Sequence, residues 1–180
     1  MSSTINIVVT CTKQKTRIPS DRLQLRNLNC SSVVNRAHHW AQLFKTSNEE
    51  VVSARQLYAG DHWSVAKELQ ELGTASRTIN VWVASAGYGL ISIDEPIIPY
   101  SATFSNPHPD SVILNDCDTA NIDQKTEWWN EIVTCDWPRE RPHSVAELAF
   151  ESPNNPLIVV ASRNYLHAIY DDLLRARERM

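Results

Sequence analysis

Three short runs of apolar, mostly β-branched residues constrain the fold of this 180-residue chain more than any other feature. They are INIVVTC at residues 5–11, TINVWVAS at 78–85 and LIVVAS at 157–162. Continuous apolar character is typical of strands that are covered on both faces, as in parallel sheets. The segments between the runs have helical spacing and can supply crossover connections. The sequence therefore predicts one α/β domain over residues 1–180, a three-layer sandwich with a mainly parallel central sheet.

Apolar periodicity and capping residues also predict the helices. Asp61 is expected to be the N-cap of the third of them, and Thr126 to cap the fourth. A short strand is expected within DSVILND, residues 110–116. The expected helices cover residues 32–44, 49–60 ended by Gly60, 62–72, 126–133, 144–150 and an amphipathic closing segment at 163–180.

Composition excludes several classes of protein. The hydrophobic fraction of 42% is ordinary for a globular chain, so intrinsic disorder is not expected. No apolar run approaches the roughly 18 residues that a membrane span needs, and the N-terminus lacks the basic region of a signal peptide. We therefore expect a cytoplasmic protein with no membrane contact.

Charge and cysteine usage narrow the chemistry further. The net charge of -4 argues against a general nucleic-acid coating protein but allows a local basic groove. The four cysteines have no CxxC spacing and are expected to be buried thiols. No cluster of His, Cys and Asp has metal-ligand spacing, so neither a metal nor another cofactor is expected.

Three loops follow the carboxyl ends of the predicted strands, where ligands bind in open α/β sheets. They are TCTKQK, ASAGYG and ASRNY, and they carry Lys13, Lys15 and Arg163. These cations are expected to converge on phosphate groups, and Gly87 and Gly89 to offer a backbone anion nest at positive φ. The alternative is a set of solvated loop cations beside a tight turn.

The segment SAGYGLISIDEPIIPY, residues 85–100, resembles the signature of the YaaA-type peroxide-stress proteins and their shorter relatives. The similar positions are Ser85, Tyr88, Gly89, Leu90, Asp94, Pro99 and Tyr100. The segments TCTKQK and ARQLYAG also fit the shorter relatives. At the level of the fold these families resemble the uracil-DNA glycosylase superfamily, and some small members look like antiviral DNA glycosylases that remove hypermodified bases from phage DNA.

The resemblance implies a monofunctional DNA N-glycosylase that flips a modified base out of phage DNA and leaves an abasic site. Glucosylated hydroxymethylcytosine is one candidate base. Such a reaction builds positive charge on the sugar, which a carboxylate can stabilise, so Asp94 and Glu95 are the candidate catalytic residues. Tyr88, Tyr100 and Ser85 are the candidate base-binding residues.

Each assignment has a structural alternative. Asp94 can close an Asx turn, Tyr88 can pack in the core or the loop, and Tyr100 can close the loop through a hydroxyl hydrogen bond. Trp128 and Trp129 adjoin on a helix, so at least one is expected to be exposed. Two other functions also remain open. One is a non-catalytic nucleic-acid-binding protein of the YaaA kind, and the other is a hydrolase of free nucleosides or nucleotides.

Overall fold

A computed structural model describes residues 3–114, 124–140 and 142–178 of the chain. It is an α/β structure in which a four-stranded sheet has the order β4-β3-β1-β6. The principal strands of that sheet are β1 (Ser3–Thr10), β3 (Arg77–Ser85), β4 (Gly89–Ser92) and β6 (Leu157–Val160). β1 pairs in parallel with β3 and with β6, which confirms that the three apolar runs share one sheet in parallel.

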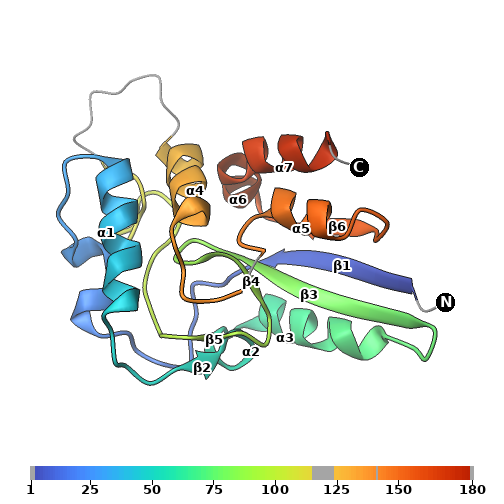
Figure 1. The fold of residues 1–180 in the computed structure, drawn as a ribbon. Helices are drawn as coiled ribbons and strands as arrows, with labels where there is room; N and C mark the ends of the chain where they lie inside the picture. The colour runs from blue at the N-terminus through green and yellow to red at the C-terminus, as the bar shows by residue number, and fades with distance from the viewer. Residues whose placement is uncertain (1–2, 115–123, 141, 179–180) are drawn as a thin grey trace.

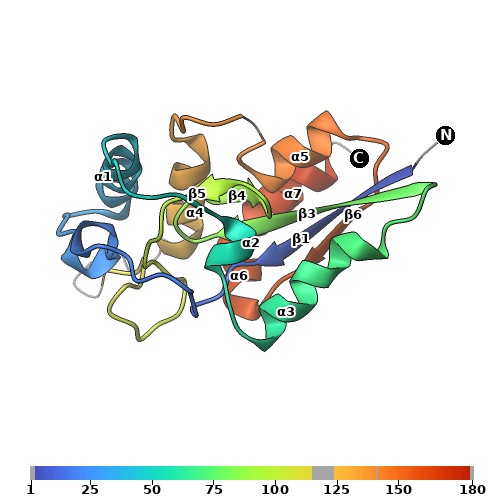
Figure 2. The same ribbon diagram turned by 90° about the horizontal axis from the view of Figure 1, so that it is seen from below.

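Helices cover both faces of this sheet (Figure 1). The view from below shows α3 in front of β1 and β3, with α5, α6 and α7 on the far side (Figure 2). The helices are α1 (Val33–Lys45), α2 (Ala54–Leu57), α3 (Asp61–Glu68), α4 (Gln124–Thr134), α5 (Val145–Glu151), α6 (Arg163–Ala168) and α7 (Tyr170–Arg177). Three 3-10 turns, η1 (Asp21–Leu23), η2 (Leu25–Asn27) and η3 (Leu69–Leu72), complete the helical elements of the described residues.

Side-chain caps explain where two of the predicted helices begin. The Ser32 hydroxyl accepts a hydrogen bond from the Asn35 N–H at the start of α1, and Ser144 does the same for Glu147 at the start of α5. Both helices lie within a residue or two of their predicted bounds. Thr126 lies inside α4, and its hydroxyl donates to the His167 carbonyl rather than capping the helix.

The segment 49–60 differs most from its prediction. Instead of one helix it forms the short strand β2 (Val52–Ser53) and the single turn α2, and β2 pairs antiparallel with β5 (Pro96–Ile97). Gly60 does not end a helix: at φ 101° it is the N-cap of α3, so Asp61 is the first helical residue and not the cap. The strong β-branched pair Val51–Val52 has outweighed the helical spacing here.

Two further strand features were not predicted. β4 runs antiparallel to β3, so the chain that leaves β3 at the carboxyl edge turns back along it. β6 is an edge strand in which Ile158 and Val160 are 47% and 49% exposed and Leu157 and Val159 are half-buried, so the third run is not covered on both faces. In place of the strand expected at 110–116, Ser111 makes an isolated bridge to Thr103, and residues 115–116 and Cys117 lie outside the described residues.

Candidate functional site

Segments far apart in the sequence meet at the carboxyl ends of β1, β3 and β6. We call the six side chains that gather there the edge cluster: Cys11, Lys15, Tyr58, Ser85, Tyr100 and Tyr165. Five of them come from the segments TCTKQK, ARQLYAG and SAGYGLISIDEPIIPY, so the parts of the sequence that carry the family resemblance converge in space.

Hydrogen bonds join the members of the edge cluster. The Tyr100 hydroxyl lies 2.7 Å from Ser85 Oγ and 2.9 Å from the Tyr58 hydroxyl, and Tyr58 donates to Ser85 over 3.3 Å. Cys11 Sγ lies 2.8 Å from the Tyr165 hydroxyl and accepts from Tyr100 at 3.6 Å. Burial raises the pKa of Tyr58, Tyr100 and Tyr165 well above the usual value, so all three phenols stay protonated at neutral pH.

Lys15 stands over the ring faces of this network. Its Nζ is 4.6 Å from the ring centre of Tyr100 and 5.7 Å from that of Tyr58, within the range of cation–π attraction. Its one hydrogen bond is a long contact of 3.4 Å to the Thr12 carbonyl, and within the described ranges no carboxylate pairs with it. Burial lowers the pKa of Lys15, while the charges of Cys11 and Asp110 partly oppose that shift. A larger fraction of this amine is therefore neutral than in an exposed lysine.

The backbone fixes Lys15 in this position. Lys15 and Tyr58 form an isolated antiparallel bridge, flanked by hydrogen bonds from the Thr16 N–H to the Leu57 carbonyl and from the Ala59 N–H to the Gln14 carbonyl. The Thr12 hydroxyl also donates to the Ala59 carbonyl. The loop that follows β1 is thus fastened to the segment that follows α2.

Charged groups surround the edge cluster. Asp110 is buried, and its carboxylate accepts hydrogen bonds from the Arg26 guanidinium, the Arg26 N–H and the Ser101 hydroxyl. Burial favours the protonated acid, but these bonds prevail and hold the pKa of Asp110 below its usual value. Burial also lowers the pKa of His108, and Lys13, Lys15 and Arg26 lower it further. Lys13 and Lys15 therefore act on one imidazole, as expected for cations that share an edge.

Arg163 is exposed, whereas the two glycines expected to form an anion nest are buried. Arg163 begins α6 just after β6 and is exposed, so it too lies at the carboxyl edge. Gly89 has the expected positive φ of 75°, but Gly87 does not; Gly87 is required because a Cβ there would lie 2.4 Å from the Tyr100 ring. Both glycines are buried, and the Gly87 N–H is bound to Ser85 Oγ. The expectation that both glycines adopt positive φ and form an anion nest at the surface is therefore wrong.

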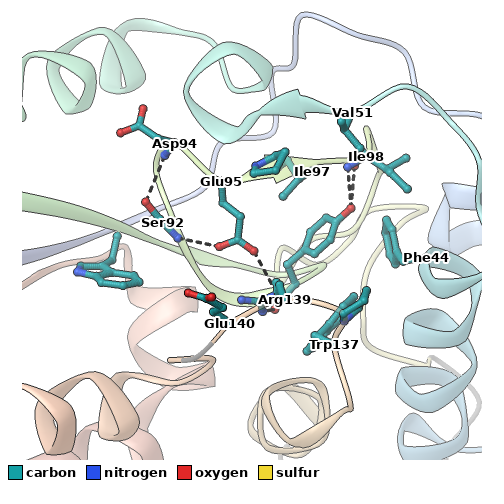
Figure 3. A pocket seen from close by; sticks show the side chains of 14 residues that line it. Phe44, Val51, Ser92, Asp94, Glu95, Ile97, Ile98, Trp137, Arg139 and Glu140 are labelled. Atoms are coloured by element: carbon teal, nitrogen blue, oxygen red, sulfur yellow. Dashed lines mark hydrogen bonds and ion pairs between the residues drawn. The ribbon is translucent and has the colours of Figure 1, made fainter.

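A second region is a cavity of about 640 Å³ beside β4 and β5 (Figure 3). Its lining is Phe44, Val51, Trp82, Tyr88, Ser92, Asp94, Glu95, Pro96, Ile97, Ile98, Trp137, Pro138, Arg139 and Glu140. We call it the β4–β5 cavity. The ring of Tyr88 packs 4.5 Å from Phe44 and 5.2 Å from Trp137, centre to centre. Tyr88 is locked in place, because its hydroxyl donates to the Ile98 carbonyl and accepts from the Ile98 N–H.

Glu95 and Arg139 form a shielded ion pair in the β4–β5 cavity. Arg139 Nε lies 3.3 Å from Glu95 Oε1, and the two side chains are 12% and 16% exposed. Neither of these two atoms makes a hydrogen bond within the described ranges, although Arg139 donates to the Tyr88 and Leu90 carbonyls. Burial raises the pKa of Glu95, with Arg139 opposing it, and burial lowers the pKa of Arg139. The carboxyl group has the environment of a proton donor or acceptor.

Asp94 does not lie at the carboxyl edge. Because β4 turns back, the Ile93 N–H reaches the Val81 carbonyl, well below the end of β3. Asp94 lies on the rim of the β4–β5 cavity, 56% exposed, and accepts hydrogen bonds from Arg55 at 2.7 Å and Gln70 at 3.3 Å. Asp94, a candidate catalytic residue, is therefore separated from the carboxyl edge that carries Lys13 and Lys15, the candidate phosphate-binding residues.

The structure thus separates the predicted site residues into two groups. Ser85, Tyr100 and Lys15 are in the edge cluster, with Lys13 and Arg163 nearby, whereas Tyr88, Asp94 and Glu95 line the β4–β5 cavity. The sequence did not single out Tyr58, Tyr165, Asp110 or Arg139. Two of them had a signal: Tyr58 lies in the segment ARQLYAG, which was part of the resemblance, and Tyr165 ends the loop ASRNY that follows the third apolar run.

Both adjacent tryptophans are fully buried, which corrects the expectation that one would be exposed. Trp128 Nε1 donates to the Ala86 carbonyl, and Trp129 Nε1 donates to Asp172 Oδ2. Trp128 therefore stabilises the loop between β3 and β4 through this hydrogen bond. Neither side chain is available to grip a partner.

No protein-family model, curated protein or solved structure matches this chain. Among the described residues, no group of three His, Cys, Asp or Glu side chains is placed to hold a metal ion. Each helix in the described ranges is too short or too polar to cross a lipid bilayer.

Proposed function

We propose that this chain excises a modified base from DNA at the edge cluster, within a fold of the uracil-DNA-glycosylase type. The observation that carries the proposal is the placement of Lys15 Nζ over the rings of Tyr58 and Tyr100, on a hydrogen-bonded network built from the segments that carry the family resemblance. Ligands in open α/β sheets bind at this edge.

The charges at the edge favour a nucleic-acid backbone. Lys13, Lys15 and Arg26 act together on His108, and Arg163 follows β6 at the same edge. Phosphate contacts of this kind position a nucleic acid without reading its sequence. A local set of cations is compatible with the net charge of -4.

Asp110 supports the glycosidic chemistry in place of Asp94. Cleavage of the N-glycosidic bond leaves positive charge on the sugar, which a fixed negative charge stabilises without reorganising. Asp110 carries such a charge: Arg26 and Ser101 hold both of its oxygens, the guanidinium offsets part of the charge, and the remaining field reaches Lys15. Its role is electrostatic stabilisation, since its lone pairs are already engaged.

The test is abasic-site formation on a panel of modified phage genomes, with unmodified DNA and free nucleotides alongside. We expect abasic sites in one modified genome, and their loss in Lys15→Ala. Lys13→Ala, the matched control on the same loop, should weaken binding and its salt dependence by about one phosphate contact, a log–log slope change of roughly 0.9. DNA binding without abasic sites on any genome would favour the non-catalytic YaaA-type alternative.

The β4–β5 cavity favours a second candidate function, hydrolysis of free nucleosides. The specific observation is Glu95, a carboxyl group of raised pKa within a cavity walled by Tyr88 and Trp137. Aromatic faces can stack a base, and a carboxyl group of this kind can act as acid or base. Acidic rim residues Asp94 and Glu140 favour an uncharged nucleoside over a phosphorylated one. Nucleoside hydrolysis that is lost in Glu95→Gln but kept in Lys15→Ala would select this function.

A further inference from the structure

We infer that Lys15 is an amine nucleophile that bonds to C1′ of the deoxyribose, so that the chain also cuts the DNA strand at the abasic site. This inference rests on the proposed base excision and names the chemistry of the edge cluster. It changes the expected reaction from simple hydrolysis, in which water attacks the sugar, to a covalent route with strand cleavage.

The environment of Lys15 differs from that of a lysine that only holds phosphate. A phosphate-binding lysine works as an exposed point charge, as the exposed Lys13 does. Lys15 is half-buried against two aromatic faces, with one long hydrogen bond and no carboxylate partner in the described part of the chain. Desolvation of this kind is how proteins prepare a lysine to attack carbonyl-type carbon atoms.

The surroundings also hold the amine still. The rings beneath it cannot rotate away, because the Tyr58 and Tyr100 hydroxyls are bonded to each other and to Ser85. The backbone of Lys15 is paired with that of Tyr58. A nucleophile fixed against a rigid surface loses little freedom when it reaches its target. The lowered pKa of Lys15 adds a neutral, reactive fraction of the amine.

The covalent step balances without any further reagent. The Nζ lone pair bonds to C1′, the C1′–N bond breaks, and the base leaves with that electron pair and takes up a proton. Opening of the sugar ring, with protonation of O4′, leaves an iminium between Nζ and C1′. Loss of the C2′ proton to solvent then expels the 3′-phosphate, and water releases the amine. On a ready-made abasic site, Nζ and the C1′ aldehyde form the same iminium by losing water.

The test uses the full chain and a labelled duplex that carries one abasic site, with sodium borohydride to reduce the iminium to a stable amine. The wild-type chain should give a covalent protein–DNA band and a strand break, and mass spectrometry should place the link on Lys15. Lys15→Arg keeps the positive charge over the tyrosine rings but lacks a nucleophilic amine. Its trapped band should fall to the level of heat-unfolded protein, whereas Lys45→Arg, the same substitution at a lysine at the end of α1 that pairs with Asp136, should trap as the wild type does.

Melting temperatures measured on each variant ensure that only folded proteins are compared. Trapping in Lys15→Arg equal to the wild type, or a link on another residue, would overturn the inference. Because the duplex already contains the abasic site, this result does not depend on which base is excised. Abasic sites formed without trapping would support the proposed base excision and contradict the lysine mechanism. Trapping without excision on any genome would support the reactive lysine and contradict the proposed base excision.

Discussion

The edge cluster and the β4–β5 cavity contrast in how they are built. The edge cluster is a network of hydroxyl and thiol groups with one half-buried amine above it, whereas the cavity is a hollow with an ion pair in its wall. The cavity has the hollow shape of a ligand site. The edge cluster lies at the carboxyl ends of the strands, where ligands bind in open α/β sheets. The contrast teaches that the largest hollow and the site proposed for the chemistry need not coincide, and the predictions below separate the two.

The largest expected effect is on activity at the edge. Lys15→Met removes the amine but keeps an apolar stem over the tyrosine rings, and base excision should fall by about 10² to 10⁴. Glu95→Gln and Asp94→Asn alter only the cavity and should retain excision. Product formation on the responsive phage genome, normalised to folded protein, measures all three. Full excision in Lys15→Met would move the chemistry away from the edge.

Next comes the stability of the cavity. Arg139→Met leaves the shielded Glu95 without its partner, so the free energy of unfolding should fall by about 3–5 kcal/mol. Arg55→Met is the matched control, because its pair with Asp94 is more exposed and should contribute only about 0–1 kcal/mol. Urea unfolding measures both. Equal losses in the two variants would mean that burial does not set the cost of the broken pair.

A smaller loss is expected from Tyr100→Phe. This change leaves the buried Ser85 and Tyr58 hydroxyls with one partner fewer, at a cost of about 1–3 kcal/mol. It should also loosen the surface beneath Lys15 and reduce trapping on the abasic duplex. Tyr170→Phe, an exposed tyrosine, is the control and should change neither quantity. A Tyr100→Phe protein as stable as the wild type would show that the network adds no stability.

The smallest expected effect is a pH dependence of stability in the cavity. The folded-state pKa of Glu95 is raised, so the fold binds this proton more tightly than the unfolded chain does. The stability it contributes is complete below the ordinary value of 4.5 and is lost as pH rises through the raised value. Relative to the wild type, Glu95→Gln should therefore gain stability across that window. A difference between the two proteins that stays constant with pH would contradict the raised pKa.

The parallel strands were predicted well because a strand that is covered on both faces needs a continuous run of apolar residues, as in β1 and β3. The sequence could not tell that β6 lies at an edge, since LIVV reads the same with one face open. The sequence did not reveal the four-residue strand β4 inside SAGYGLISIDE. Because β4 turns the chain back along β3, Asp94 lies at the β4–β5 cavity and not at the carboxyl edge. The capping serines allowed the starts of α1 and α5 to be predicted. The helix predicted at 49–60 was wrong because the β-branched Val51–Val52 pair favours the strand that forms there.

The edge cluster was predicted only in part, for a different reason. Local patterns identified Lys15 and Tyr100, but the bond between the Tyr58 and Tyr100 hydroxyls joins residues 42 positions apart. Nothing in the neighbourhood of Tyr58 in the sequence specifies that contact. It follows from how the loop after β1 is fastened to the segment after α2, which is a property of the packed structure.

Aromatic contacts from Tyr88 and Phe44 to Tyr100 join the two regions. The Tyr88 ring, which lines the β4–β5 cavity, meets the Tyr100 ring edge-on at 5.4 Å, and Tyr100 carries Lys15 on its face. A molecule that binds in the cavity and displaces Tyr88 therefore also alters the surface on which the amine rests. Thermodynamic linkage makes such an influence reciprocal, so DNA at the edge would alter the affinity of the cavity by the same factor. The Tyr88–Tyr100 contact would then make the occupancy of either region depend on that of the other.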